Sequence, residues 1–238
     1  MRVFALLVAA GRGTRLGGTE PKQFLPVAGV PVLRRAAEAL LREGLVEAIQ
    51  PVCGAGEEAR VAAILDGLPV RPAVPGGASR QASVLAGLEA VGAEAPDLVL
   101  IHDAARPVVP PGTVAALIDA LSHRAGALPA LPVTDTLRRG VPDGDGAPVA
   151  GGIVPRDGLY RAQTPQAFRY SAILRAHRDA AGGPDATDDV ALLERAGMEV
   201  AIVPGSESNV KITHPGDLER VEAALRGGLL PRVGTGYD

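Results

Sequence analysis

Residues 2–15 read RVFALLVAAGRGTR, an apolar run that leads directly into a loop of small residues, glycines and arginines. A short β-prone run that ends in small residues is typical of a buried strand, so we expect a strand over residues 2–8. An apolar run beside a starting methionine is also typical of a signal peptide, but this run is at the short limit for one. The loop that follows carries candidate chemistry instead of a cleavage site, which favours the strand.

Strand-like and helix-like segments alternate after this first strand. Apolar runs predict strands at residues 46–52, 70–74, 98–101, 127–133, 199–203 and 210–212. Helical periodicity predicts helices at residues 31–42, 57–68, 79–91, 114–121, 171–181, 188–196 and 215–226, with Ser79 and Thr213 as N-caps. Such alternation predicts an α/β fold: a Rossmann-like, mostly parallel twisted sheet with helices on both faces.

The alternation stops at Asp135. From there to about Gln166 the chain is polar, rich in glycine and proline, and without helical period, with the turn cluster PDGDG at residues 142–146. A stretch of this length without periodicity is unusual inside a compact domain and is usually functional. We expect a protruding β-hairpin arm over about residues 135–160, with its tip at residues 140–146.

Composition excludes several classes of protein. The chain has 238 residues, of which 47% are hydrophobic, and a formal net charge of −3. With no Trp, three Phe and three Tyr, it has neither the basic surface nor the stacking platform that nucleic acid requires. No apolar run approaches the ~20 residues that span a bilayer, so we expect no membrane partner. The single cysteine, Cys53, excludes a disulfide framework and fits a cytoplasmic protein.

Lysine is rare in this sequence. Of the 24 basic residues, only Lys22 and Lys211 are lysine, and the others are arginine. Lysine is a compact point charge whereas arginine is a planar fork, so the two are not interchangeable at a tight site. Chance survival of two surface lysines is the alternative, but both lie in motif-like stretches.

The loop at residues 9–22 follows the first predicted strand. Ligands of an open α/β sheet bind beyond the carboxyl ends of its strands. The glycines of this loop let backbone amides approach an anion, and Arg15 and Lys22 add two cations, which predicts a polyphosphate cradle. A flexible surface loop is the alternative. Leu16 replaces the third glycine of a dinucleotide fingerprint, and no GK pair exists for a P-loop.

Two further loops are expected at the same edge of the sheet. Asp103, at the end of a predicted strand, is a candidate metal- or ribose-binding carboxylate, with an ion pair to Arg106 as the alternative. The loop at residues 76–83, GGASRQAS, could read a base edge or simply begin a serine-capped helix. His102 is expected to pack or to form hydrogen bonds at the strand end.

Eight short motifs occur in a characteristic order: AAGRGTR, PKQF, GGxxRxxSV, HDAARP, the DT of PVTDT, TPQAF, TDD and NVKIT. Their order and spacing resemble the 2-C-methyl-D-erythritol 4-phosphate cytidylyltransferase family, over essentially residues 1–228. Two positions depart from the family pattern. Val8 stands where proline is usual, and Ala78 stands where an acidic residue is frequent, so only a backbone contact carries over at Ala78.

This resemblance implies a reaction. A cytidylyl group passes from CTP to 2-C-methyl-D-erythritol 4-phosphate, with Mg²⁺, and pyrophosphate is released, in the non-mevalonate route to isoprenoid precursors. The resemblance implies roles at the reacting phosphates for Arg15, Lys22 and Lys211. It implies nucleotide contacts from Ala9, Ala10, Gly11, Gly13, Gly77, Ser83, Asp103 and Ala104, and acceptor contacts from Thr136, Arg156, Thr187 and Lys211. Asp103 is also the implied Mg²⁺ ligand.

The same resemblance implies a homodimer in which the arm, with Thr136 and Arg156, crosses to complete the site of the neighbouring subunit. Two other functions stay open from the sequence. One is cytidylyl transfer to another polyol phosphate, such as ribitol 5-phosphate. The other is a non-catalytic nucleotide-binding regulator, against which the two lysines and Arg15 argue, because a binder has less need of transition-state charge.

Residues 232–238, RVGTGYD, lie outside this match. They resemble the opening strand of 2-C-methyl-D-erythritol 2,4-cyclodiphosphate synthase, in which Asp238 would be a metal ligand. A flexible tail with accidental similarity is the alternative. We therefore expect a cytidylyltransferase domain at residues 1–231 and the start of a second enzyme at residues 232–238.

Overall fold

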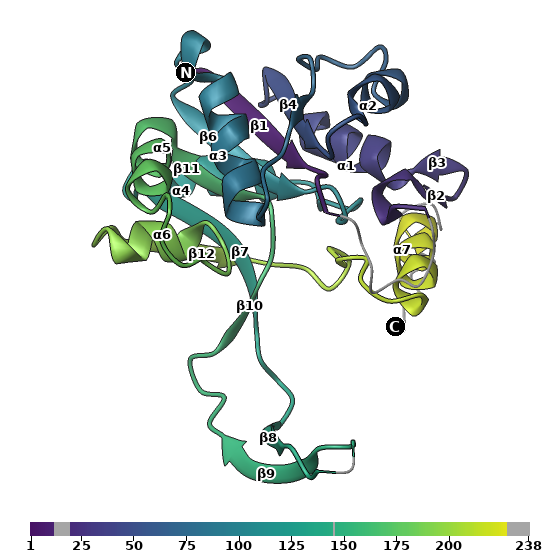
Figure 1. Ribbon diagram of the computed structural model, residues 1–238, viewed down its shortest axis with the longest axis vertical. Helices are drawn as coiled ribbons and strands as arrows, with labels where there is room; N and C mark the ends of the chain where they lie inside the picture. Colours follow the sequence, from purple (N-terminus) through teal and green to yellow (C-terminus); the bar gives the residue numbers. More distant parts are fainter. Residues whose placement is uncertain (12–19, 145, 228–238) are drawn as a thin grey trace, which may run out of the picture.

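The computed structural model describes residues 1–11, 20–144 and 146–227. The strands of its central sheet are β1 (Val3–Val8), β4 (Ala48–Cys53), β5 (Val74–Pro75), β6 (Leu98–Asp103), β7 (Gly126–Pro132), β10 (Tyr160–Ala162), β11 (Gln166–Arg169) and β12 (Val200–Pro204). Their order is β10-β7-β11-β6-β1-β4-β5, and β12 also pairs with β7 (Figure 1). β1 is parallel to β4 and β6, β5 to β4, and β12 to β7, while β10 and β11 are antiparallel to their neighbours.

Helices cover both faces of this sheet. They are α1 (Val32–Leu41), α2 (Glu58–Ile64), α3 (Arg80–Ala90), α4 (Thr113–Ala120), α5 (Tyr170–Asp179), α6 (Val190–Arg195) and α7 (Gly216–Gly227), with 3₁₀ turns η2 (Lys22–Phe24) and η3 (Gly92–Glu94). In β1, Ala5 and Leu7 pack with side chains of α1, α2 and α4, while Phe4 and Leu6 pack with those of α3, α5 and α6. Successive strand residues point to opposite faces, which produces this division. The predicted α/β fold is confirmed.

A third, smaller hydrophobic cluster packs α7, the last helix that the structure describes, against the hairpin that follows η2. The hairpin of β2 (Pro26–Val27) and β3 (Val30–Pro31) lies against α7 (Figure 1). Val27, Ile212 and Val221 are fully buried in the cluster between them. Oε1 of Glu222 on α7 accepts a hydrogen bond from the Ala28 amide at 3.1 Å. This packing fixes the segment before α7 next to η2, and these two segments carry Lys211 and Lys22.

The expected arm contains the hairpin of β8 (Leu137–Val141) and β9 (Val149–Val154), which stands away from the central sheet (Figure 1). Gly140 pairs with Ala150 and Val141 with Val149. Residues 140 and 141 therefore belong to a strand, and the predicted tip at residues 140–146 began two residues too early.

Two predicted strands also need correction. The strand expected at residues 70–74 is reduced to Val74–Pro75, because Pro69, Pro72 and Pro75 supply no amide donors for a ladder. Residues 210–212 form no strand, since the segment meets the loop after β6 and not a strand edge. Its backbone contact there is the bond from the Ile212 amide to the Ala105 carbonyl, 2.9 Å long.

Of the two predicted helix caps, one is confirmed and one is wrong. Oγ of Ser79 accepts from the Ala82 amide at 3.2 Å and caps α3. Thr213 does not cap α7. Instead Oδ2 of Asp217 accepts from the amides of Thr213 and His214, both at 2.9 Å.

Among the described residues, none of the helices has the length and hydrophobicity that crossing a bilayer requires.

Candidate active site

A cleft of about 570 Å³ opens where β1 and β6 end, a size that suits a small-molecule ligand. Loops and helix ends from five parts of the chain meet there. The described lining comprises Val8, Ala9, Ala10, Gly11, Lys22, Gln23, Gly77, Ala78, Ser79, Arg80, Ser83, Asp103, Ala104, Ala105, Lys211 and Thr213. The cleft thus lies at the carboxyl ends of parallel strands, as predicted for a ligand site in this class of fold.

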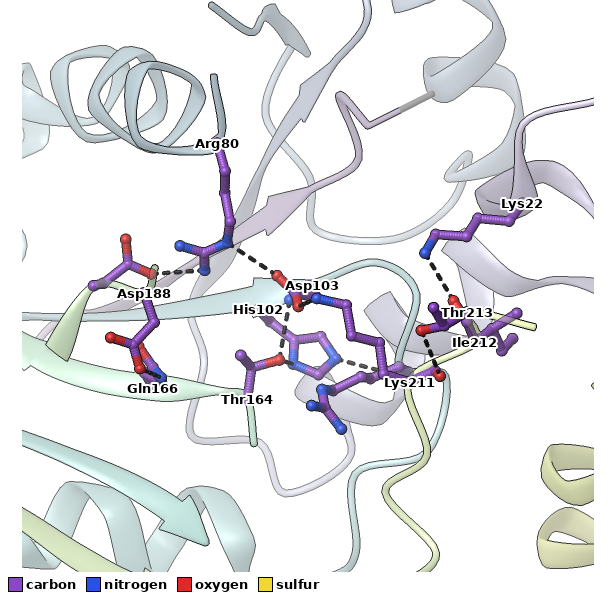
Figure 2. A network of polar contacts seen from close by, with 12 residues as sticks. Lys22, Arg80, His102, Asp103, Thr164, Gln166, Asp188, Lys211, Ile212 and Thr213 are labelled. Carbon is purple, nitrogen blue, oxygen red and sulfur yellow. Dashed lines mark hydrogen bonds and ion pairs between the residues drawn. The ribbon is translucent and has the colours of Figure 1, made fainter. Parts of the chain in front are cut away.

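Asp103 lies among the cations of this cleft. Its Oδ2 is 2.6 Å from Nζ of Lys211, and its Oδ1 is 3.4 Å from Nε of Arg80 (Figure 2). Burial alone would raise the pKa of Asp103, but the charges of Arg80 and Lys211 outweigh it and hold that pKa well below its ordinary value. The carboxylate is therefore ionised. Arg106, the partner considered from the sequence, instead donates to the Asn209 carbonyl at 2.6 Å.

A chain of neutral hydrogen bonds fixes the end of β6. His102 is fully buried, and burial lowers its pKa to about 4, so the imidazole is neutral. Because the Arg106 carbonyl can only accept, Nε2 of His102 carries the proton and donates to it at 2.9 Å. Nδ1 then accepts from the Thr164 hydroxyl at 3.0 Å, and that oxygen accepts from the Asp103 amide at 3.1 Å. As expected, His102 holds the strand end.

The two-glycine loop before α3 lies too close to its neighbours for side chains. A Cβ on Gly76 would lie 2.6 Å from the Cβ of Ala10, and one on Gly77 would lie 2.5 Å from that of Ala82. Oγ of Ser83 accepts from the Gly77 amide at 3.1 Å and donates to the Ser79 carbonyl at 2.8 Å. Ser83 therefore holds the loop in place while it lines the cleft.

Lys22 enters the cleft from η2. Its Nζ donates to the Ile212 carbonyl at 2.7 Å, which places it beside the segment that carries Lys211 (Figure 2). The next residue, Gln23, is buried and donates from Nε2 to the Ala9 carbonyl at 2.8 Å, so η2 is anchored to the end of β1. The described lining thus contains three cations, Lys22, Arg80 and Lys211, and a single carboxylate, Asp103. Such a site is suited to polyanions.

The structure brings together most of the residues predicted to contact the nucleotide or the reacting phosphates. Those in the lining are Ala9, Ala10, Gly11, Lys22, Gly77, Ser83, Asp103, Ala104 and Lys211. Gly13, Arg15 and Asp238 lie outside the described residues. Thr136, Arg156 and Thr187 are exposed and do not line this cleft, and Arg156 donates to the Thr134 carbonyl.

Sequence reasoning missed two features of the site. Gln23, within the PKQF motif, was not recognised as the anchor of η2, although a polar residue beside a candidate catalytic lysine was a usable signal. Arg80 was considered for reading a base edge, but it is a counter-ion of Asp103. Its position directly after the cap Ser79, at a helix end facing the site, could have revealed that role.

A mostly parallel sheet that gathers glycine loops and cations beyond its central strands is typical of α/β proteins that bind phosphorylated ligands. The sequence model of the 2-C-methyl-D-erythritol 4-phosphate cytidylyltransferase family matches residues 3–227. The chain belongs to this family.

Similar proteins cover the whole chain. The bifunctional enzyme IspD/IspF of Granulibacter bethesdensis is 52% identical over 238 residues, and that of Gluconobacter oxydans is 50% identical over 249 residues. Each match covers 100% of this chain and 60% of the relative, so the chain spans about 60% of the length of these relatives. The crystal structure of 2-C-methyl-D-erythritol 4-phosphate cytidylyltransferase from Thermus thermophilus matches with a TM-score of 0.78 and 37% identity, over 95% of this chain and 100% of that one.

Proposed function

We propose that this chain is a nucleotidyltransferase that passes a cytidylyl group from CTP to 2-C-methyl-D-erythritol 4-phosphate and releases pyrophosphate. Family membership supports this choice of donor and acceptor over another polyol phosphate. The observation that carries the proposal is the cleft itself, whose described lining contains the cations Lys22, Arg80 and Lys211 and one carboxylate, Asp103, which pairs with Arg80 and Lys211.

The proposed chemistry needs charge and positioning more than proton transfer. A phosphate oxygen of the acceptor attacks the α-phosphorus of CTP, a new P–O bond forms, and the bond to the pyrophosphate oxygen breaks. The attacking oxygen is already ionised at neutral pH, so no general base is required. His102, neutral and held by hydrogen bonds, is accordingly not needed as one. Lys22 and Lys211 would hold two polyanions together and stabilise the charge that builds up on the α-phosphate.

Mg²⁺ fits this cleft as a companion of the nucleotide. The side chain of Asp103 is ionised and 12% exposed, and a carboxylate oxygen is a ligand that Mg²⁺ prefers. Among the described residues, no group of three or more His, Cys, Asp or Glu side chains could hold an ion by itself. Asp103 and the phosphate oxygens of CTP would therefore hold it, and the bound ion would neutralise charge on those phosphates. Arg80 and Lys211 would keep the carboxylate oriented.

A homodimer with exchanged arms belongs to the same proposal. Thr136 and Arg156 flank the hairpin of β8 and β9, away from the cleft of their own chain. The hairpin exposes large apolar side chains, Val141 by 47%, Val149 by 49% and Ile153 by 63%. Exposed apolar residues gathered on one element support a protein interface. A second copy that covers them would receive Thr136 and Arg156 at its own acceptor pocket.

A cytoplasmic location is also part of the proposal, supported by the buried, unpaired Cys53.

The division into a transferase domain at residues 1–231 and an opening strand at residues 232–238 stays a proposal. Residues 228–238 lie outside the described part of the chain. The names of the two bifunctional relatives support a second enzyme in such proteins. If the transferase domain needs none of this tail, deleting residues 229–238 should change cytidylyl transfer by less than about twofold. Loss of transfer would assign the tail to the transferase.

A turnover assay tests the activity itself. The chain is incubated with CTP, Mg²⁺ and 2-C-methyl-D-erythritol 4-phosphate, and pyrophosphate release and the cytidine diphosphate ester of the acceptor are measured. We expect product in that mixture and much slower turnover with ribitol 5-phosphate as the matched acceptor. Faster turnover with ribitol 5-phosphate, or CTP binding without any turnover, would contradict the proposal.

A further inference from the structure

Asp189 lies behind the cleft, directly before α6, with its side chain 1% exposed. Its Oδ2 is 2.7 Å from Nη2 of Arg80, and its Oδ1 accepts from Nε2 of His177 at 3.2 Å. His177, on α5, is fully buried. A buried carboxylate is stable only when it is paired and hydrogen-bonded. Arg80 is therefore held from behind by Asp189, which is itself fixed by the packed interior.

Arg80 connects this buried carboxylate to the cleft. Its Nη2 contacts Asp189 and its Nε contacts Asp103, so Asp189, Arg80, Asp103 and Lys211 form a row of alternating charges (Figure 2 shows the Arg80–Asp103 contact). The Lys211 end of the row is 39% exposed and the Asp189 end is 1% exposed. The buried end is thus the fixed one. Nη1 of Arg80 makes no hydrogen bond to the described residues, which leaves it for a ligand in the cleft.

The segment that carries Asp189 is docked on the first turn of α3. Oγ of Ser79 donates to Oδ1 of Asp185 at 2.9 Å, and Oε1 of Gln81 accepts from the Ala186 amide at 2.8 Å. Together with the contact of Arg80 to Asp189, three successive residues at the start of α3 bind residues 185–189. The first turn of α3 follows the Gly77 loop, so this segment determines where one wall of the cleft lies.

We propose that Asp189 is a positioning residue for the nucleotide site: it holds Arg80 so that the guanidinium orients Asp103 and presents Nη1 to the bound nucleotide. The inference rests on the proposed function only for the identity of that nucleotide. Asp189 itself lies outside the described lining of the cleft, and Arg80 is the lining residue that its carboxylate contacts, so we expect its effect to pass through Arg80.

The first test is the affinity for CTP, measured by calorimetry with Mg²⁺, of the variant Asp189→Asn. This change keeps the side-chain volume and removes the charge. We expect the Kd to rise roughly 10- to 100-fold, as is typical when a supporting partner of a binding group is lost.

Asp188→Asn is the matched control. Asp188 accepts from the Ala191 amide at 3.1 Å and from Nε2 of Gln166 at 3.0 Å. The Oε1 atom of Gln166 has no partner among the described residues, so its amide can turn and accept from the introduced amide. We expect this control to bind CTP within about twofold of the parent chain, because its hydrogen bonds go to Gln166 and Ala191, neither of which lines the described cleft. Equal affinities of the two variants would overturn the inference.

A double-mutant cycle separates positioning from mere structural support. If Asp189 acts through Arg80, then Arg80→Gln combined with Asp189→Asn should bind CTP within about twofold of Arg80→Gln alone. A double variant at least about fivefold weaker would overturn the inference. The double variant removes both charges of the pair, and in Arg80→Gln the carboxylate of Asp189 keeps its hydrogen bond from His177, so this comparison does not require Asp189→Asn alone to fold.

A failure of the proposed function can be told apart from a failure of the inference on Asp189. A parent chain that binds CTP without turnover contradicts the reaction, while the binding cycle still decides the role of Asp189. A parent chain that binds no CTP overturns both.

Discussion

Nζ of Lys211 lies 2.6 Å from Oδ2 of Asp103, which joins one of the two lysines of the sequence to the one acidic side chain in the described lining of the cleft. The two residues are 108 positions apart: Asp103 ends β6, and Lys211 lies in the irregular segment before α7. Lys211 therefore has two tasks in the proposed reaction. Together with Arg80 it keeps Asp103 ionised, and it would supply positive charge where phosphates bind.

Replacing Lys211 should affect both tasks. We expect Lys211→Ala to lower kcat/KM by roughly 10²-fold or more, because a charge near the reacting phosphates and a counter-ion of Asp103 are lost together. Lys211→Arg should recover little, since a planar fork does not replace a point charge at a tight site. Steady-state pyrophosphate release measures both. Arg220→Ala, at an exposed arginine of α7, is the control and should be unaffected. Near-normal activity of Lys211→Ala would exclude Lys211 from the reaction.

His102 makes the stability of the fold depend on pH. Its pKa is lowered from 6.5 to about 4 by burial, so between these values the unfolded chain binds a proton that the folded chain does not. The free energy of unfolding should therefore fall as the pH falls through 6.5, by up to about 3 kcal/mol once the pH is below 4. Urea unfolding from pH 7 to pH 4 measures the slope.

His102→Gln is the control for that measurement. The introduced amide can still donate to the Arg106 carbonyl but takes up no proton in this range. The difference between the two pH curves therefore isolates His102 from the carboxylates that titrate nearby. Parallel curves for the two proteins would show that His102 is not a buried neutral imidazole.

The exchanged arm predicts complementation between two impaired variants. Arg156→Ala should raise the KM for the sugar phosphate and leave CTP affinity unchanged, because it removes a phosphate clamp. Mixed with Lys22→Ala under subunit exchange, it should restore about a quarter of normal activity, since half of the dimers are mixed and each has one intact site. No recovery, with exchange confirmed by mass spectrometry, would show that each site is built within one chain.

The centre of the fold could be predicted because its signal is local. β1, β4, β6 and β7 are contiguous apolar runs, and the helices between them have a clear period. β10 and β11 were missed because β10 lies inside, and β11 at the end of, a stretch that reads as polar and irregular. β11 has only four residues, and it exists because it pairs with β6 and β7, which are distant in sequence. Pairing of this kind depends on tertiary structure more than on local propensity.

The site was predictable in its residues more than in their contacts. Lys22, Asp103 and Lys211 were expected at one edge of a sheet, and all three line the cleft. That Asp103 pairs with Arg80 instead of Arg106 depends on where α3 begins relative to β6. Asp189 stands in the TDD motif, but its burial against Arg80 follows only from the docking of residues 185–189 on α3.

The rate of the chemical step in Lys22→Ala is the measurement that tests the central claim most directly. Lys22 lies in the described cleft beside the Lys211 segment, where its charge would act mainly on the transition state. In single-turnover experiments with CTP, Mg²⁺ and the sugar phosphate, we predict a rate roughly 10²–10³-fold below that of the parent chain, with CTP affinity changed far less. A variant that keeps a near-normal rate would contradict the assignment of this cleft as the site of cytidylyl transfer.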